Sequence, residues 1–131
     1  MPYSTFTRQS VLNHLFRNIA MPSPTTVFLA LYTSNPNEDN SGTEVTGGAY
    51  ARQEITYAAP SAGTNMQEIR NTNVVTFPRA TADWGRVTHF GIMTAVSGGQ
   101  LLQFEAILVP QDVLNGNEAV VNPNENVLQL Q

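Results

Sequence analysis

The only tryptophan of the chain lies in the run Thr81-Ala-Asp-Trp-Gly-Arg-Val-Thr-His-Phe-Gly-Ile-Met-Thr-Ala-Val-Ser-Gly-Gly-Gln-Leu-Leu102, around which the other predicted elements are arranged. Residues 86–94 are rich in β-branched and aromatic residues, and residues 100–108 resume a strand-like pattern. Between them, Ser97-Gly98-Gly99 supplies the positive backbone angles that a tight reversal needs. The pattern predicts a β-hairpin.

The run after this turn has the alternation of a strand with one buried face. Every second residue from Leu102 to Leu108 is apolar, whereas Gln103 and Glu105 fall on the other side. We expect the apolar side to be buried and Glu105 to point outward. Val109-Pro110 is interpreted as a break in the strand, and residues 111–117 as a turn.

A single amphipathic helix is predicted near the start of the chain, over residues 8–18. Thr7 is the expected N-cap, and Phe6 is expected to pack against Val11 as a hydrophobic staple. We expect the apolar face of the helix to pack on the chain's own sheet, with docking onto a partner as the alternative. That face is formed by Val11, Leu12, Leu15 and Phe16.

The rest of the chain reads as short strands separated by clusters of Gly, Pro, Asn and Ser. Residues 26–33 are apolar on both faces, which is typical of a central strand. Further strands are expected at residues 50–57, 66–70, 74–77, 118–121 and 127–130, the last two forming a pair. About seven or eight short strands without βα units predict an all-β fold, a β-sandwich of jelly-roll or Greek-key type, in one domain spanning residues 1–131.

Composition excludes several classes of protein. The net charge is −4, and the six cations are all arginines scattered along the chain, so no basic track for nucleic acid is expected. No apolar run has the length of about 20 residues that a membrane span needs. Cysteine is absent, and charged residues make up only 12%. A polar but weakly charged surface favours a chain that is packed against neighbouring molecules.

No catalytic constellation is evident, and we expect neither enzymatic activity nor a cofactor. His89 lies inside a predicted strand and is interpreted as structural. Asp83, Glu105 and Glu54 are nominal carboxylates for glycoside hydrolysis, but such pairings arise by chance among ten acids. Trp84 is a candidate for stacking on a sugar, although core packing is favoured.

The loop at residues 34–48 contains oxygen donors at alternate positions, Asn35, Asn37 and Asp39, as a calcium loop does. The EF-hand template fails at two positions, because Asn40 replaces its glycine and Thr46 replaces its closing glutamate. We therefore expect no metal site.

Four runs of the sequence, at residues 29–36, 42–53, 75–92 and 97–102, resemble small virion proteins of tailed bacteriophages. The most specific of these motifs are Gly-Gly-x-Tyr-Ala-Arg at residues 47–52 and Trp-Gly-x-Val-Thr-His-Phe-Gly-Ile at residues 84–92. Members are described as tail-fibre, capsid decoration or cement proteins. The resemblance extends over roughly residues 12–130 and implies a β-sandwich structural protein that is made in the host cytoplasm and has no catalytic motif.

Two functions follow from this resemblance. The first is a capsid decoration (cement) protein on the capsid surface, bound as a homo-oligomer (dimer or trimer) to the major capsid protein and stabilising the shell. The alternative is a tail-tip or tail-fibre component that contacts a saccharide or receptor on the host cell. The first is preferred here, because the chain has neither heptads nor fibrous repeats. No nucleic acid or membrane partner is expected.

Overall fold

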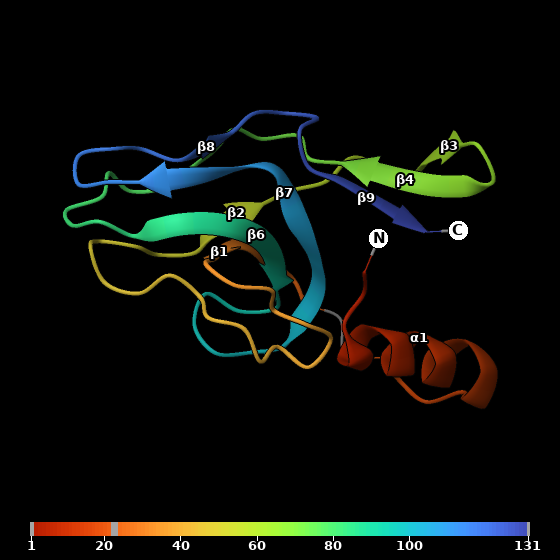
Figure 1. Ribbon diagram of the computed structural model, residues 1–131. Coiled ribbons are helices and arrows are strands. Elements are labelled where there is room, and N and C mark those ends of the chain that lie inside the picture. Colours follow the sequence, from red (N-terminus) through yellow and green to blue (C-terminus); the bar gives the residue numbers. More distant parts are fainter. Residues whose placement is uncertain (1, 22–23, 131) are drawn as a thin grey trace.

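A computed structural model describes residues 2–21 and 24–130, and within these residues the chain is mostly β, with one helix and nine strands in three antiparallel sheets (Figure 1). The expected all-β, sandwich-like fold is confirmed. No helix in this part of the chain is long and apolar enough to cross a membrane. The elements are α1 (Thr5–Arg17), β1 (Val27–Tyr32), β2 (Gln53–Ile55), β3 (Ser61–Gly63), β4 (Met66–Arg70), β5 (Val75–Thr76), β6 (Gly85–Met93), β7 (Leu101–Val113), β8 (Val120–Val121) and β9 (Val127–Leu130).

The largest sheet has the strand order β2-β1-β6-β7. β1 lies inside this sheet, as its apolar composition predicts, and its last four residues are all buried. Leu29 and Leu31 point to one side of the sheet and pack in the main core, whereas Ala30 and Tyr32 point to the other side and pack in a smaller cluster. Neither face of β1 meets solvent, so its residues do not alternate between apolar and polar, and its sequence is a continuous apolar run.

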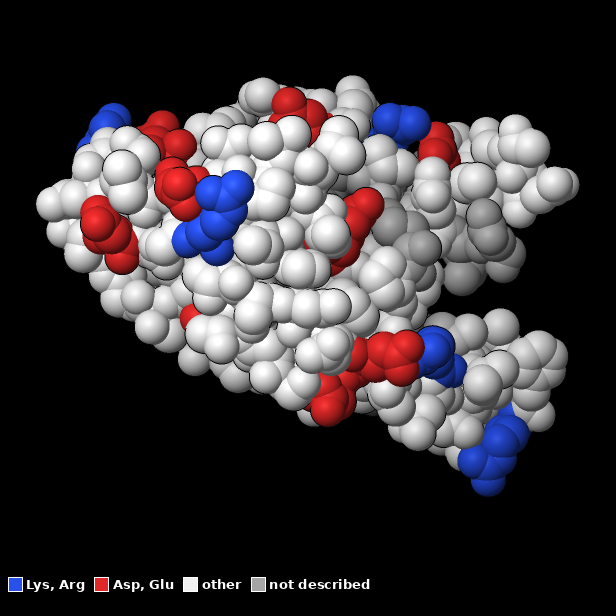
Figure 2. Space-filling view, in the orientation of Figure 1, with Lys and Arg blue, Asp and Glu red and all other residues white. Residues whose placement is uncertain are grey.

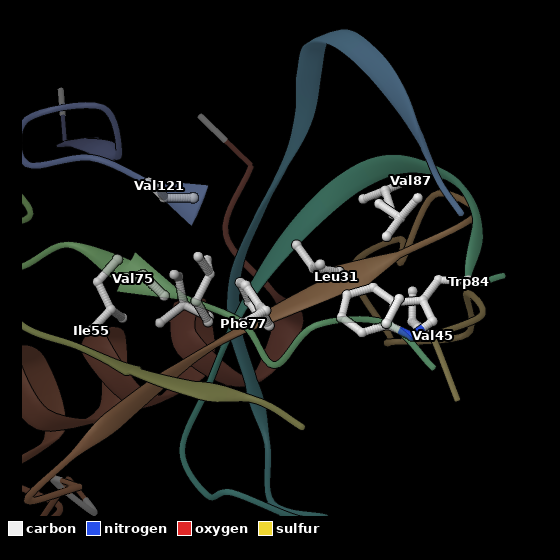
Figure 3. Close-up of a cluster of buried hydrophobic side chains, with 12 residues drawn as sticks. Leu31, Val45, Ile55, Val75, Phe77, Trp84, Val87 and Val121 are labelled. Carbon is white, nitrogen blue, oxygen red and sulfur yellow. The ribbon is translucent and has the colours of Figure 1, made fainter. Parts of the chain in front are cut away.

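The main core lies between this sheet and a second layer that contains the β5–β8 ribbon, and from the β3-β4-β9 sheet Leu128 packs against it. Figure 3 shows side chains from both layers meeting there, among them Leu31 from β1, Val75 from β5 and Val121 from β8. Trp84 is buried, and its ring meets those of Tyr50 and Phe77 edge to face. Trp84 therefore packs in the core, as the sequence favoured.

The predicted hairpin is present as β6 and β7, and its turn contains Gly98 and Gly99 with φ of 66° and 73°. The predicted end of β7 is wrong. The strand runs through Pro110 to Val113, because residues 107–110 form a wide bulge opposite Thr88 and proline is tolerated at a bulge.

The assignment of the two faces of β7 is correct for Phe104, which is buried, but wrong for Ala106, Leu108 and Glu105. Leu102 lies opposite no residue of β6, so the alternation shifts at that point. Gln103 is therefore buried and Glu105 half-buried on the inner side of the sheet, whereas Ala106 is exposed and Leu108 is 97% exposed. A bulge exchanges the two faces of a strand, and residue pattern alone does not show where it occurs.

The last two predicted strands exist, but they do not pair with each other. β8 pairs with β5, and β9 pairs with β4. A buried pair of asparagines separates them, since Asn71 accepts a hydrogen bond from the Asn126 amide (2.9 Å) and donates to the Asn122 carbonyl (3.0 Å). This pair directs the chain after β8 towards the β4 edge.

The helix begins three residues earlier than predicted. Ser4, not Thr7, is the N-cap, and its hydroxyl accepts a hydrogen bond from the Thr7 amide at 3.1 Å. Phe6 therefore lies within the first turn of α1, and the expected staple with Val11 is not formed as predicted. The helix ends at Arg17, where Asn18 adopts a left-handed C-cap with φ of 55°.

Candidate interaction surfaces

A groove with a volume of about 1050 Å³ runs between β7 and the segment that leads into β8. One wall is formed by residues 105–113 of β7, and the other by residues 116–121. Its inner end reaches Leu31 and Phe77 of the core. The groove exists because β7 and β8 are not hydrogen-bonded to each other, and because the bulge bends β7 at residues 107–110.

The far wall of the groove is fixed to the body by backbone hydrogen bonds. The Phe77 amide donates to the Ala119 carbonyl at 2.9 Å, and the Gly116 amide donates to the Ala80 carbonyl at 2.7 Å. At one end, the buried Asn126 side chain accepts a hydrogen bond from the Tyr57 hydroxyl at 2.7 Å. The wall at residues 116–121 is thus held in place by the chain's own hydrogen bonds.

The groove offers both apolar and polar groups. Leu108 and Val109 are exposed on the bulge, at 97% and 62%, and Val120 is exposed on the opposite wall. Four carboxylates line it against one arginine: Glu105, Asp112, Glu118 and Glu125, with Arg79. Burial raises the pKa of Glu105 above its ordinary value. Such a surface suits a ligand with many hydroxyl groups and some apolar area.

The second uncovered surface is on α1. None of its thirteen residues, all of which the structure describes, is buried. Leu12, Leu15 and Phe16 are 57%, 65% and 77% exposed, so the expectation that this face packs on the chain's own sheet is wrong. Figure 2 shows α1 projecting from the body, with the charged side chains of this view in small separate groups.

The nominal catalytic carboxylates do not converge. Glu54 is exposed on β2 and Glu105 lies on β7, which are the two opposite edges of the four-stranded sheet. With strands about 4.8 Å apart, their backbones are separated by roughly 14 Å, more than the carboxyl separation of glycoside hydrolases. Asp83 accepts a hydrogen bond from the Asn115 amide at 2.7 Å and so connects two loops.

His89 lies inside a strand, as the sequence predicts. It is half-buried on β6, and its Nδ1 lies 2.8 Å from the Thr88 hydroxyl. Burial lowers its pKa below the ordinary value, which favours the neutral ring. Neither Asp83 nor any other acid forms an ion pair with His89 among the described residues.

The oxygen donors of the 34–48 loop bind the loop itself. Asn35 accepts a hydrogen bond from the Asn37 amide (2.9 Å), and Asp39 accepts one from the Ser41 amide (3.1 Å). Hydrogen bonding to Ser41 lowers the pKa of Asp39. In the part of the chain that the structure describes, no three acidic or histidine side chains are grouped as a metal site requires.

Sequence comparison identifies the group of proteins to which this fold belongs. The profile of the family described as Podophage GP4 fiber I protein gp80 matches residues 2–129, which is nearly the whole chain. The chain belongs to this family. It is therefore a bacteriophage virion structural protein, as the resemblance of the four sequence runs implies. No curated protein matches the sequence.

The two motifs that carry the family resemblance are structural. In the first, Gly48 has φ of 57° and its carbonyl accepts a hydrogen bond from the Trp84 indole at 2.8 Å. In the second, a Cβ at Gly91 would lie 2.7 Å from the Tyr32 ring, so only glycine fits there. These fiber-family motifs thus specify the core, whereas the groove walls at residues 105–121 and the projecting helix lie outside them.

The first motif also supplies the best-enclosed ion pair of the described residues. Arg52 donates to both carboxylate oxygens of Glu44 at 2.8 Å, and also to the Ala95 and Gly98 carbonyls at 2.8 Å. The same carboxylate accepts a hydrogen bond from Tyr50. Arg52 therefore fastens the turn of the β6–β7 hairpin to the 34–48 loop. This pairing is not predictable from local pattern, because the partners are brought together only by the fold.

Proposed function

We propose that the chain is a non-enzymatic tail-fibre component, and that its groove contacts a saccharide on the host-cell surface. The observation that supports the tail location is the family match, because that family is described by a fiber protein. The alternative location, on the capsid as a decoration protein bound to the major capsid protein, has no comparable support. The tail-fibre role is therefore preferred to the capsid decoration role, which the absence of heptads favoured.

The groove supports the proposed contact with a host saccharide. Carboxylate and amide groups are the hydrogen-bonding partners that sugar hydroxyls require, and the groove combines them with the apolar side chains of Leu108, Val109 and Val120. In Figure 1, β8 and the C-terminal end of β7, which form the groove, lie at the upper left of the body, whereas α1 projects at the lower right, beside the start of β7. One side of the molecule is thus available for the particle and the other for the host.

Localisation on purified virions tests the tail assignment. We expect antibodies against the chain to label the tail, and quantitative gels to give few copies per particle relative to the major capsid protein. Labelling spread over the shell with a high copy number would overturn the tail assignment in favour of the capsid decoration protein.

Competition for host cells tests the role of the groove. We expect the purified chain to reduce phage adsorption and the Asn117→Ala/Glu118→Ala variant to do so much less, because both side chains are exposed on the groove wall. Thr64→Ala/Gln67→Ala, exposed in the β3–β4 region, is the matched control and should compete like wild type. Equal competition by both variants would exclude the groove.

A further inference from the structure

Five large apolar side chains on α1 and on the residues after it are exposed, and they are named the apolar stripe here: Leu12, Leu15, Phe16, Ile19 and Met21. Their exposed fractions are 57%, 65%, 77%, 42% and 39%. The spacing of three and four residues places the helical members on one face. Side chains of this size rarely remain in water together on a functional surface unless another molecule covers them.

α1 is not free to fold back and bury this stripe against its own body. The Thr7 hydroxyl donates to the Leu102 carbonyl at 2.7 Å, and the Ser4 amide donates to the same carbonyl at 3.0 Å. The Thr5 amide donates to the Glu38 carbonyl at 3.0 Å, and Arg8 forms an ion pair with the Glu38 side chain. These contacts fix the first turn and therefore the direction in which the helix leaves the body.

We propose that the apolar stripe packs against the same stripe of a second copy of this chain. The inference is independent of the host contact proposed above, because it concerns a different surface. In such a dimer the stripe of each copy covers the stripe of the other, so that no further partner is required. The contact is isologous, with the same residues contributed by both chains.

The distribution of charge on α1 permits this contact. The helix has no acidic residue, and the basic residues near its C-terminal end are His14 and Arg17. His14 is about 200° around the helix axis from both Leu12 and Phe16, and its Nδ1 lies 3.3 Å from the Ile19 carbonyl. Arg17 donates to the Asn13 side chain at 2.9 Å, away from the centre of the stripe. Two stripes can therefore meet without bringing like charges together.

The area of the stripe is sufficient for a specific contact. Five large apolar side chains at these exposed fractions present on the order of 500 Å² per chain. Two copies would thus bury roughly 1,000 Å², which is about the lower limit for a specific protein interface. An association of moderate strength, reinforced by the high local concentration in a particle, is expected from this area.

Analytical ultracentrifugation of the purified chain tests the proposal. We expect the wild type to associate with increasing concentration above its monomer mass of 14.3 kDa. Leu15→Glu should weaken this association by about thirtyfold or more, the loss seen at an interface hot spot. Gln67→Glu places the same charge on the exposed side of β4, away from α1, and should associate like wild type. Fluorescence of the buried Trp84 verifies that both variants are folded.

Two results would overturn the proposal. A wild type that stays monomeric at all concentrations would show that the stripe has a different partner. In the second, the groove variant Leu108→Glu also fails to associate, but a mixture of Leu108→Glu and Leu15→Glu does associate. That result would show that α1 of one copy enters the groove of the next. Neither result bears on the competition experiment with host cells, so the two proposals fail independently.

Discussion

β1 and α1 are both apolar in sequence, but their surroundings in the fold are opposite. β1 is paired on both edges, with β2 and β6, and side chains on both of its faces are buried. α1 touches the body through its first turn and leaves Leu12, Leu15 and Phe16 more than half exposed. An apolar pattern thus indicates that a face is to be covered, but it does not indicate which chain supplies the cover.

Replacing one leucine in each region is expected to give the largest difference in the free energy of unfolding. Leu29→Ala in β1, where the side chain is fully buried, should lower the free energy of unfolding by about 2–5 kcal/mol. Leu15→Ala in α1 should change it by at most about 0.5 kcal/mol in dilute solution, where the chain is monomeric. Urea unfolding monitored by tryptophan fluorescence measures both. A similar loss in the two variants would mean that the monomer already buries α1.

The ion pairs of the molecule allow the same comparison between enclosed and exposed groups. Arg52 is 9% exposed and holds Glu44, whereas Arg8 and Glu38 are 50% and 56% exposed. Arg52→Ala leaves the Glu44 carboxylate enclosed without its cation, and we expect a loss of about 3–5 kcal/mol in the free energy of unfolding. Arg8→Ala should cost about 0–1 kcal/mol.

The substitution Arg52→Lys separates the effect of charge from the effect of hydrogen-bond geometry. Lysine keeps the charge but cannot make the four hydrogen bonds that Arg52 donates to Glu44, Ala95 and Gly98. A loss of stability close to that of Arg52→Ala would assign the effect to geometry. Full recovery by lysine would contradict this assignment and attribute the effect to charge.

Sequence reasoning succeeded where local pattern and tertiary structure agree. The β6–β7 hairpin was predicted because Gly98 and Gly99 specify the turn, and β1 because a run of apolar residues without polar alternation fits only a strand covered on both faces. β4 and β9 were found at the predicted residues. In each case neighbouring residues alone determine the element.

Prediction from sequence was wrong where residues distant in the chain determine the local structure. Pro110 was interpreted as a strand break, although the bulge opposite Thr88 accommodates it within β7. The same bulge and the extra Leu102 place Glu105 in the groove, so the groove was not predicted. The exposure of α1 was missed because amphipathicity is the same whether a helix packs on its own chain or on another.

The smallest expected effect concerns Glu105, which β7 places in the half-buried groove wall. Its pKa is raised by burial, so the folded chain binds this proton more tightly than the unfolded chain does. Stability contributed by protonated Glu105 is therefore present at low pH and is lost as the pH rises from the ordinary value of 4.5 through the raised one. Asp39 and Glu125 have lowered pKa values and act in the opposite direction, so the wild-type profile alone does not isolate Glu105.

We expect Glu105→Gln to gain stability relative to wild type between pH 4 and pH 7, by up to about 1 kcal/mol. Urea unfolding of both chains across this range measures the difference, and Glu118→Gln on the exposed wall of the same groove controls for the loss of one negative charge. A difference that is independent of pH would show that Glu105 stays solvated, and that the groove wall does not enclose it as the geometry of β7 requires.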